Sequence, residues 1–249
     1  MKNSAQEIKA RLAADKFALL SGAEVVVPAE FEAERARFFG EWQDLELDRY
    51  LKGGARFRRR RFAWFFFDAA DERISRHPVE TYFQSSGLNS YSGGIDRSFA
   101  PLSRASGESP FLHHLIRFDF HQLPIPAERH AQRWTVDVHQ IRVEVNGDEE
   151  GLPTPEGMHR DGDDYVCAHL IARKNVLGGE SSVSDDDGKV LARATLCKPL
   201  DTLIVWDPFV LHGVTPIVPR ECGTPALRDM LLIGFHRRIL PPSERAQRG

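Results

Sequence analysis

The sequence has few cysteines and lacks any long apolar run. Cys167, Cys197 and Cys222 stand far apart, and no C-x-x-C pair occurs. Three isolated cysteines argue against a disulfide framework and against a cysteine-ligated zinc site, and they fit a reducing cytosol. Apolar stretches stay well below the roughly 18 residues of a membrane span, and charges interrupt the N-terminus as they would not in a signal peptide. We therefore predict a cytoplasmic protein that binds no membrane.

An excess of charge of one sign is also missing. The 33 Lys and Arg residues nearly balance the 36 Asp and Glu residues, which leaves a net charge of −3. Nucleic-acid binders normally carry a basic surplus, so we expect no nucleic-acid partner. The run RFRRRRF at 56–62 is a local exception. Because it adjoins bulky aromatic residues, we interpret it as part of a strand whose arginines pair with acidic residues.

The chain is expected to form one domain, residues 1–249. Hydrophobic residues make up 41% of it, which is enough for a full core, and no repeat or linker interrupts it. Apolar spacing predicts helices over 4–20, over a stretch after Pro28 and over 109–120. The expected organisation has three parts: a helical N-terminal support over 1–55, a mixed strand, loop and helix region with a lid segment over 56–132, and a β core with the metal site over 133–240.

After about residue 133 short strands alternate with turns. Gly- and Pro-containing turns separate several apolar segments that are short enough to be strands. Many short strands with frequent turns indicate a sandwich or a barrel. The expected fold class is therefore mainly β with flanking N-terminal helices. The expected strands are WTVDVHQIRVEV, YVCAHLIAR, KVLARAT, DTLIVWD and RDMLLIGFHR.

The segment MHRDGDD contains a candidate metal site. If it is a strand, His159 and Asp161 point the same way, because side chains alternate between faces. His212 follows the apolar segment DTLIVWD and could supply a third ligand. Two histidines and one carboxylate form the facial triad of iron(II) oxygenases, which leaves coordination positions open. The His-x-Asp spacing alone is weak, since a solvated polar loop would look the same, and the setting of His212 strengthens it.

Arg228 opens the apolar segment that follows His212. A buried arginine is well suited to bind the distal carboxylate of 2-oxoglutarate through paired hydrogen bonds. The alternative is a surface arginine paired with Asp229 or Glu221. Arg220, Arg237 and Arg238 are the other candidates for the same role.

These motifs together resemble a known family, over roughly residues 55–240. The segments that carry the resemblance are MHRDG, LGGES, DTLIVWD, LHGVTPI, RDMLLIGFHR, YFQSSGLNSYSGGIDRSFAPL and VDVHQIRVEV. They look like the 2-oxoglutarate/Fe(II)-dependent dioxygenase family that includes bacterial L-isoleucine dioxygenase and related free L-amino-acid hydroxylases. The resemblance implies a double-stranded β-helix (jelly roll, cupin-like) with Fe(II) at its mouth. It also implies His159, Asp161 and His212 as ligands and Arg228 as the 2-oxoglutarate anchor.

The resemblance further implies a reaction. An unactivated C–H bond of a free L-amino acid or a small derivative would be hydroxylated with O₂, releasing succinate and CO₂, and ascorbate would enhance the activity. Sulfoxidation and desaturation remain open, as does the choice of amino acid. The alternatives are a cupin-type metal enzyme that does not use 2-oxoglutarate and a non-catalytic jelly-roll binding domain. A homodimer is expected only because dimers are common among soluble enzymes.

Two sets of residues are candidates for substrate binding. Gln140 and Arg142 share one face of their predicted strand. If that face lines the interior, Arg142 could bind a substrate carboxylate; otherwise both residues pair with acids on a solvated face. Asn89, Tyr91 and Arg97 lie in the polar segment expected to form a lid.

Other polar residues have two readings. Asp163 and Asp164 could meet a substrate amino group or could form a solvated turn. His169 and His236 lie within apolar segments, where we expect core histidines with satisfied hydrogen bonds.

Overall fold

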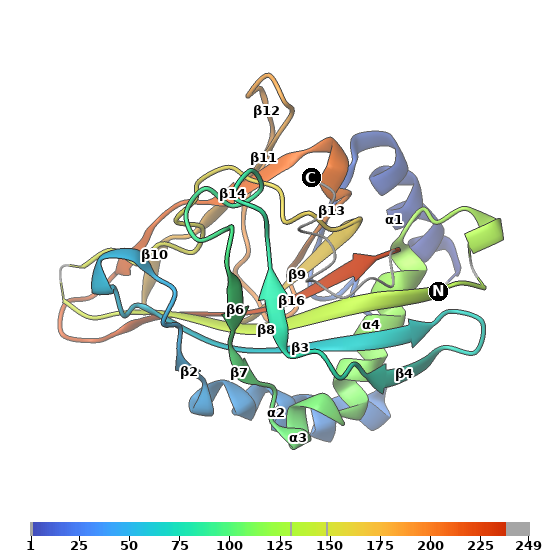
Figure 1. Ribbon diagram of the computed structural model, residues 1–249, viewed down its shortest axis with the longest axis horizontal. Coiled ribbons are helices and arrows are strands. Elements are labelled where there is room, and N and C mark those ends of the chain that lie inside the picture. The colour runs from blue at the N-terminus through green and yellow to red at the C-terminus, as the bar shows by residue number, and fades with distance from the viewer. Residues whose placement is uncertain (1, 130, 148, 238–249) are drawn as a thin grey trace.

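The computed structural model describes residues 2–129, 131–147 and 149–237, and this part of the chain holds four α-helices and sixteen strands (Figure 1). The helices are α1 (Lys2–Asp15), α2 (Glu32–Gly40), α3 (Arg104–Gly107) and α4 (Pro110–Gln122). The first eight strands are β1 (Phe17–Leu20), β2 (Glu46–Leu47), β3 (Arg58–Asp68), β4 (Arg73–Arg76), β5 (Thr81–Phe83), β6 (Asp96–Ser98), β7 (Ala100–Pro101) and β8 (Arg133–Val145). The other eight are β9 (Tyr165–Lys174), β10 (Val176–Gly178), β11 (Glu180–Ser184), β12 (Val190–Thr195), β13 (Thr202–Val205), β14 (Leu211–Val214), β15 (Ile217–Pro219) and β16 (Ala226–His236).

The main sheet has the strand order β1-β13-β9-β16-β8-β3-β2, and β4 and β7 pair with β3. Its centre is the long antiparallel pairing of β16 with β8, from Ala226 opposite Val145 to His236 opposite Thr135. A smaller sheet, β12-β11-β14, lies on the other side of the main sheet from α2 and α4 (Figure 1). Two facing antiparallel sheets form a double-stranded β-helix with N-terminal helices, so the predicted fold class is confirmed.

The helices cover one face of the main sheet. Helix α4 begins at a capping residue, Ser109, whose hydroxyl accepts a hydrogen bond from the backbone N–H of Leu112. Its apolar side, including Phe111 and Leu115, is fully buried in the same core as Leu231 and Phe235 of β16. Because this face of the sheet is filled by helices, the opposite face is left for a cavity.

Most of the expected elements are confirmed. The helix after Pro28 is α2 with its flanking short 3-10 turns, the helix over 109–120 is α4, and the arginine-rich run forms β3. His169 is a core histidine, as expected: its ring nitrogens lie 2.8 Å from Asp119 and 2.8 Å from the hydroxyl of Thr202. No helix within the described ranges is long and apolar enough to cross a membrane.

The helix expected over 4–20 is wrong in its last turn. It ends at Asp15, Lys16 takes a left-handed backbone conformation, and Phe17–Leu20 pairs with β13. Ala18 and Leu20 are buried, which is the alternation of a strand. The β core was expected to begin at residue 133. Strands β1 and β3 belong to the main sheet, so the sheet includes residues well before that position.

Candidate iron and 2-oxoglutarate site

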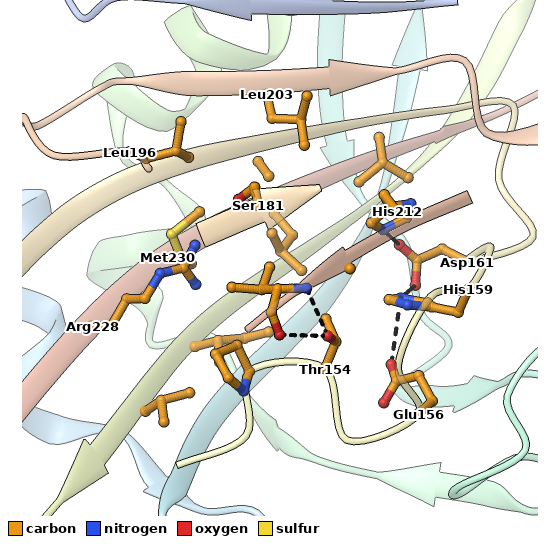
Figure 2. A pocket seen from close by; sticks show the side chains of 18 of the residues that line it. Thr154, Glu156, His159, Asp161, Ser181, Leu196, Leu203, His212, Arg228 and Met230 are labelled. Carbon is orange, nitrogen blue, oxygen red and sulfur yellow. Dashed lines mark hydrogen bonds and ion pairs between the residues drawn. The ribbon is translucent and has the colours of Figure 1, made fainter. Parts of the chain in front are cut away.

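A cavity lies between the helix-free face of the main sheet and the smaller sheet (Figure 2). It encloses about 100 Å³ of water-accessible space and opens to solvent at its mouth. Polar groups lie at its two ends, with apolar side chains between them. The apolar part includes Ile141, Val166, Ala168, Leu196, Leu203, Val205, Met230 and Leu232.

His159, Asp161 and His212 converge at one end of the cavity (Figure 2). Nε2 of His159 lies 3.5 Å from Oδ1 of Asp161, and Nε2 of His212 lies 3.2 Å from Oδ2 of the same carboxylate. One ligand atom from each residue can be chosen so that all three lie within 4.8 Å of one another. Two imidazoles and one carboxylate in this arrangement fit Fe(II) with positions left open.

The backbone brings these ligands together in a way that the sequence did not predict. His159 and Asp161 lie in a loop rather than on a regular strand. His159 instead forms an isolated β-bridge with His212, in which each backbone N–H donates to the other's carbonyl at 2.9 Å. The bridge places the two imidazole rings 4.4 Å apart between centroids.

Electrostatics in the metal-free cluster favour a bound cation. Burial opposes a charge on His159, but the carboxylates of Asp161 and Glu156 raise its pKa to about 9. Burial likewise opposes a charge on Asp161, but the two histidines hold its pKa well below the usual range. The ligands therefore hold a proton that a metal ion would displace on binding.

Asp207 fixes the loop that carries Asp161. One of its oxygens accepts a hydrogen bond from the backbone N–H of Asp161 at 3.1 Å, and the other accepts from Gly162 at 2.8 Å and Asp163 at 3.2 Å. The side chain is almost fully buried, at 1% exposed. It also lies 3.8 Å from Nδ1 of His212, so one carboxylate supports both arms of the cluster.

Replacing Asp207 with alanine is expected to weaken metal binding by roughly 10- to 100-fold, because groups that orient metal ligands have effects of this size. Anaerobic calorimetry with Fe(II) measures the change. Asp201→Ala is the matched control, since Asp201 accepts three backbone N–H bonds in the same way, from Gly22, Cys197 and Lys198. Equal losses of affinity in the two variants would mean that Asp207 has no specific role at the cluster.

Arg228 lies at the opposite end of the cavity from the cluster (Figure 2). It is 4% exposed, and its buried Nε has no hydrogen-bond partner. No carboxylate in the described part of the chain forms an ion pair with it, and burial lowers its pKa to about 10. The predicted alternative, a surface pair with Asp229 or Glu221, is therefore wrong. A buried, unpaired guanidinium at the end of a cavity is suited to bind an anion.

The comparison with known families agrees with this geometry. A family described as 2OG-Fe dioxygenase matches residues 40–234, which is most of the chain. The chain belongs to the 2OG-Fe dioxygenase family. Its cofactors are accordingly Fe(II), 2-oxoglutarate and O₂.

Individual proteins are also similar to this dioxygenase in sequence or in fold. The chain is 27% identical over 199 residues to the L-isoleucine-4-hydroxylase of Bacillus thuringiensis, a match that covers 79% of this chain and 76% of that protein. A bsmA homolog from Methylobium petroleophilum PM1 superposes with a TM-score of 0.80 at 29% identity, covering 96% of this chain and 95% of that one. IDO from Bacillus thuringiensis shares the fold, with a TM-score of 0.76 at 20% identity over 94% of this chain and 96% of that one.

Gln140 and Arg142 do not reach the dioxygenase cavity. Both lie on the face of β8 that the helices cover, where the Gln140 amide donates to Ser106 at 3.0 Å. Arg142 forms two hydrogen bonds with Asp229, at 2.7 and 2.8 Å. Of the two alternatives, pairing with an acid is therefore confirmed for Arg142, although the pair is buried rather than solvated. The opposite face of β8 carries His139, which lines a smaller pocket beside the cavity.

The Arg142–Asp229 pair is expected to stabilise the dioxygenase only as a pair. Arg142→Met should cost about 3–5 kcal/mol of unfolding free energy, because it leaves the carboxylate of Asp229 buried without its partner. The double variant Arg142→Met, Asp229→Leu should recover most of that loss. Urea denaturation of the three proteins measures both effects, and a single variant as stable as the wild type would contradict the pairing argument.

One residue of the segment expected to form a lid, Asn89, lines a smaller pocket that shares Glu156 and Asp161 with the cavity. Asn89 donates to Gln84, whose amide in turn donates to the backbone carbonyl of Asp161 at 3.0 Å. Arg97 is buried behind this layer, donating to Gln84 at 2.6 Å and lying 4.9 Å from the ring of Tyr82.

Tyr91 is not among the residues that line the cavity. Its hydroxyl accepts a hydrogen bond from the backbone N–H of Lys52 at 2.7 Å, and the ammonium group of Lys52 lies over its ring. Tyr91 therefore ties the lid segment to the N-terminal region.

Sequence reasoning missed several residues that line the site. Arg58 and Arg60 of β3 face the cavity, and Glu156 reaches to 3.4 Å from Nε2 of His159. Asp137 of β8 lies on the same face as His139. The sequence signal was weak, because Arg58 to Arg61 are four consecutive arginines and a strand places two of them on each face.

Proposed function

We propose that the chain is an Fe(II)- and 2-oxoglutarate-dependent dioxygenase that hydroxylates an unactivated C–H bond of a free L-amino acid or a small derivative. One observation carries the proposal: a single cavity has a His-Asp-His cluster at one end and a buried unpaired arginine at the other. The similarity to a relative named L-isoleucine-4-hydroxylase supports the choice of an amino acid.

Each polar end of the cavity has a distinct role in this proposal. His159, Asp161 and His212 hold the iron through two imidazole nitrogens and one carboxylate oxygen. Arg228 donates hydrogen bonds to the distal carboxylate of 2-oxoglutarate and compensates its charge inside the protein. When bound, iron and 2-oxoglutarate together activate O₂ for oxidation of a C–H bond, with succinate and CO₂ as coproducts.

The chain's own residues position the reactants and exclude water. Apolar side chains such as Leu203 and Met230 line the cavity between Arg228 and the metal ligands, which keeps the local dielectric low. Gln84 donates to Asp161 from the lid side and so restricts the orientation of that carboxylate. Oriented ligands and a shielded cavity limit side reactions of the oxidant.

The test is succinate formation by anaerobically iron-loaded protein after addition of 2-oxoglutarate, ascorbate and air. Each proteinogenic L-amino acid is supplied in turn, and mass spectrometry checks for a product heavier by one oxygen. Succinate and hydroxylated product in a subset of reactions, both absent in His159→Ala, are expected. Iron-loaded protein that forms no succinate above background with any amino acid would contradict the proposed substrate class.

We further propose that the enzyme is cytoplasmic. Cys167, Cys197 and Cys222 are all free, which supports a reducing, cytoplasmic setting. A homodimer stays a prediction from the frequency of dimers among enzymes. Light scattering coupled to size exclusion distinguishes a dimer from a monomer of 28.2 kDa.

A further inference from the structure

Basic and acidic side chains lie at different positions along the strands of the main sheet, on the face that carries the cavity and beside the metal ligands. Arg60 of β3 is the register partner of Ile141 on β8, and Asp137 lies four residues before Ile141 on the same strand. Four residues of strand span about 13 Å between Cα atoms. One pocket is lined by Arg58 and Arg60 as well as by Asp137 and Asp163, and it includes the metal ligand Asp161.

The basic end of this pocket carries one uncompensated positive charge. Arg58 forms an ion pair with the buried carboxylate of Asp48 at 2.8 Å. Arg60 has no carboxylate partner among the described residues: its guanidinium lies 4.6 Å from the ring centre of Phe99, and its buried Nε lacks a hydrogen-bond partner. Two guanidinium groups facing one carboxylate leave a site for a further anionic group.

The acidic end has the opposite imbalance. Nε2 of His236 lies 2.5 Å from a carboxylate oxygen of Asp137 and 3.0 Å from one of Asp163. All three side chains are at least nine-tenths buried. A second histidine, His139, lies 3.2 Å from the other oxygen of Asp137, is 3% exposed and lines the same pocket. Asp163 contacts only His236, which it shares with Asp137, so Asp163 has no basic partner of its own among the described residues.

The backbone makes room for these two carboxylates. Gly234 of β16 pairs with Asp137, and a Cβ atom at this position would overlap carboxylate oxygens of both Asp137 and Asp163. Glycine is otherwise unfavourable inside a strand, where it has no side chain to pack. The close approach of two acids therefore depends on this residue.

We propose that the pocket binds a free α-amino acid by both of its charges. The carboxylate lies at Arg60 and Arg58, the ammonium group lies at Asp163 and Asp137, and the apolar side chain lies along Val166 and Leu232. This inference rests on the proposed function and narrows it. The substrate is a zwitterion, so N-acylated amino acids and residues within peptides are excluded because they lack the ammonium group.

The test is calorimetric binding to the Fe(II)- and 2-oxoglutarate-loaded protein without O₂. Three probes are compared: the L-amino acid that gives most succinate (L-isoleucine if none does), the same acid without its amino group, and the corresponding amine without its carboxylate. Each lost charge is expected to weaken binding by roughly 30-fold or more, as expected when one partner of a buried charge pair is removed.

Two variants assign the charges to their ends. Asp163→Asn should weaken binding of the amino acid and the amine but leave the amine-free acid unchanged. Arg60→Met should weaken the amino acid and the amine-free acid but leave the amine unchanged. A merely structural role would weaken all three probes alike. Asp164→Asn and Arg59→Met are the matched controls, since these neighbours pair with Arg237 and Glu144 instead.

Several outcomes would overturn the inference. They are equal affinity for the amino acid and its amine-free form, equal losses for all probes in Asp163→Asn, and a second metal ion per chain lost in that variant. Failure of the proposed function shows differently, as an absence of succinate with every amino acid. Probe-selective losses in the two variants would support the inference whatever the succinate result.

Discussion

Asp161→Ala is expected to abolish both stable iron binding and 2-oxoglutarate turnover. Among the described residues, Asp161 is the one carboxylate that contacts both His159 and His212, at 3.5 and 3.2 Å, so its removal takes away a proposed ligand and the group that orients the other two. Changing a group that only supports a ligand costs roughly 10- to 100-fold in affinity, and losing a ligand should cost more. Anaerobic calorimetry with Fe(II) and a succinate assay measure the two losses.

The control for this prediction is Asp185→Ala, in the turn between β11 and β12. That variant should bind iron and form succinate as the wild type does. Asp161→Asn adds a further comparison, because it keeps the shape of the side chain but removes its charge. Iron bound at wild-type affinity by Asp161→Ala would exclude this carboxylate as a ligand and would require another acid, with Glu156 the nearest to His159.

Arg228→Met is expected to raise the KM for 2-oxoglutarate by roughly 30- to 1,000-fold, as loss of one partner of a buried charge pair does. The same substitution should leave the free energy of unfolding unchanged or increase it. The reason is that Arg228 is buried without an ion-pair partner in the described residues, and burying an unpaired charge is unfavourable. Steady-state kinetics and urea denaturation measure the two effects.

Matched variants separate charge from hydrogen-bond geometry at this position. Arg228→Lys keeps the charge but loses the planar fork, so an intermediate KM is expected. Arg220→Met removes an exposed arginine and should change neither quantity. An unchanged KM in Arg228→Met would show that 2-oxoglutarate is anchored elsewhere, and the neighbouring Arg173 would be the first residue to examine.

The His-Asp-His cluster was predictable because two of its three residues are close in sequence. His159 and Asp161 are two residues apart, and His212 follows an apolar strand that must end near the cavity mouth. The reason given for their shared orientation was nevertheless incomplete, since the loop takes its shape from the β-bridge to His212 and from Asp207. These contacts join residues 53 and 45 positions apart, respectively, which no local pattern encodes.

The orientation of β8 was not predictable from alternation. Both of its faces are buried, one by the helices and one at the cavity, and both carry polar side chains. Alternation assigns Gln140 and Arg142 to one face and His139 to the other, but the position of α3 and α4 decides which face meets the ligand. The same limit hid Arg58 and Arg60, because the cavity that surrounds them forms only when β3 joins the main sheet.

One cavity is proposed to bind 2-oxoglutarate between the iron and Arg228. Anaerobic addition of 2-oxoglutarate to the Fe(II)-loaded protein, followed by absorption spectroscopy, tests it most directly, since chelation of Fe(II) by a 2-oxoacid produces a visible charge-transfer band. A saturable band is expected in the wild type, at much higher 2-oxoglutarate concentration in Arg228→Met, and not at all in Asp161→Ala. A wild-type protein that binds iron but develops no band would contradict the claim.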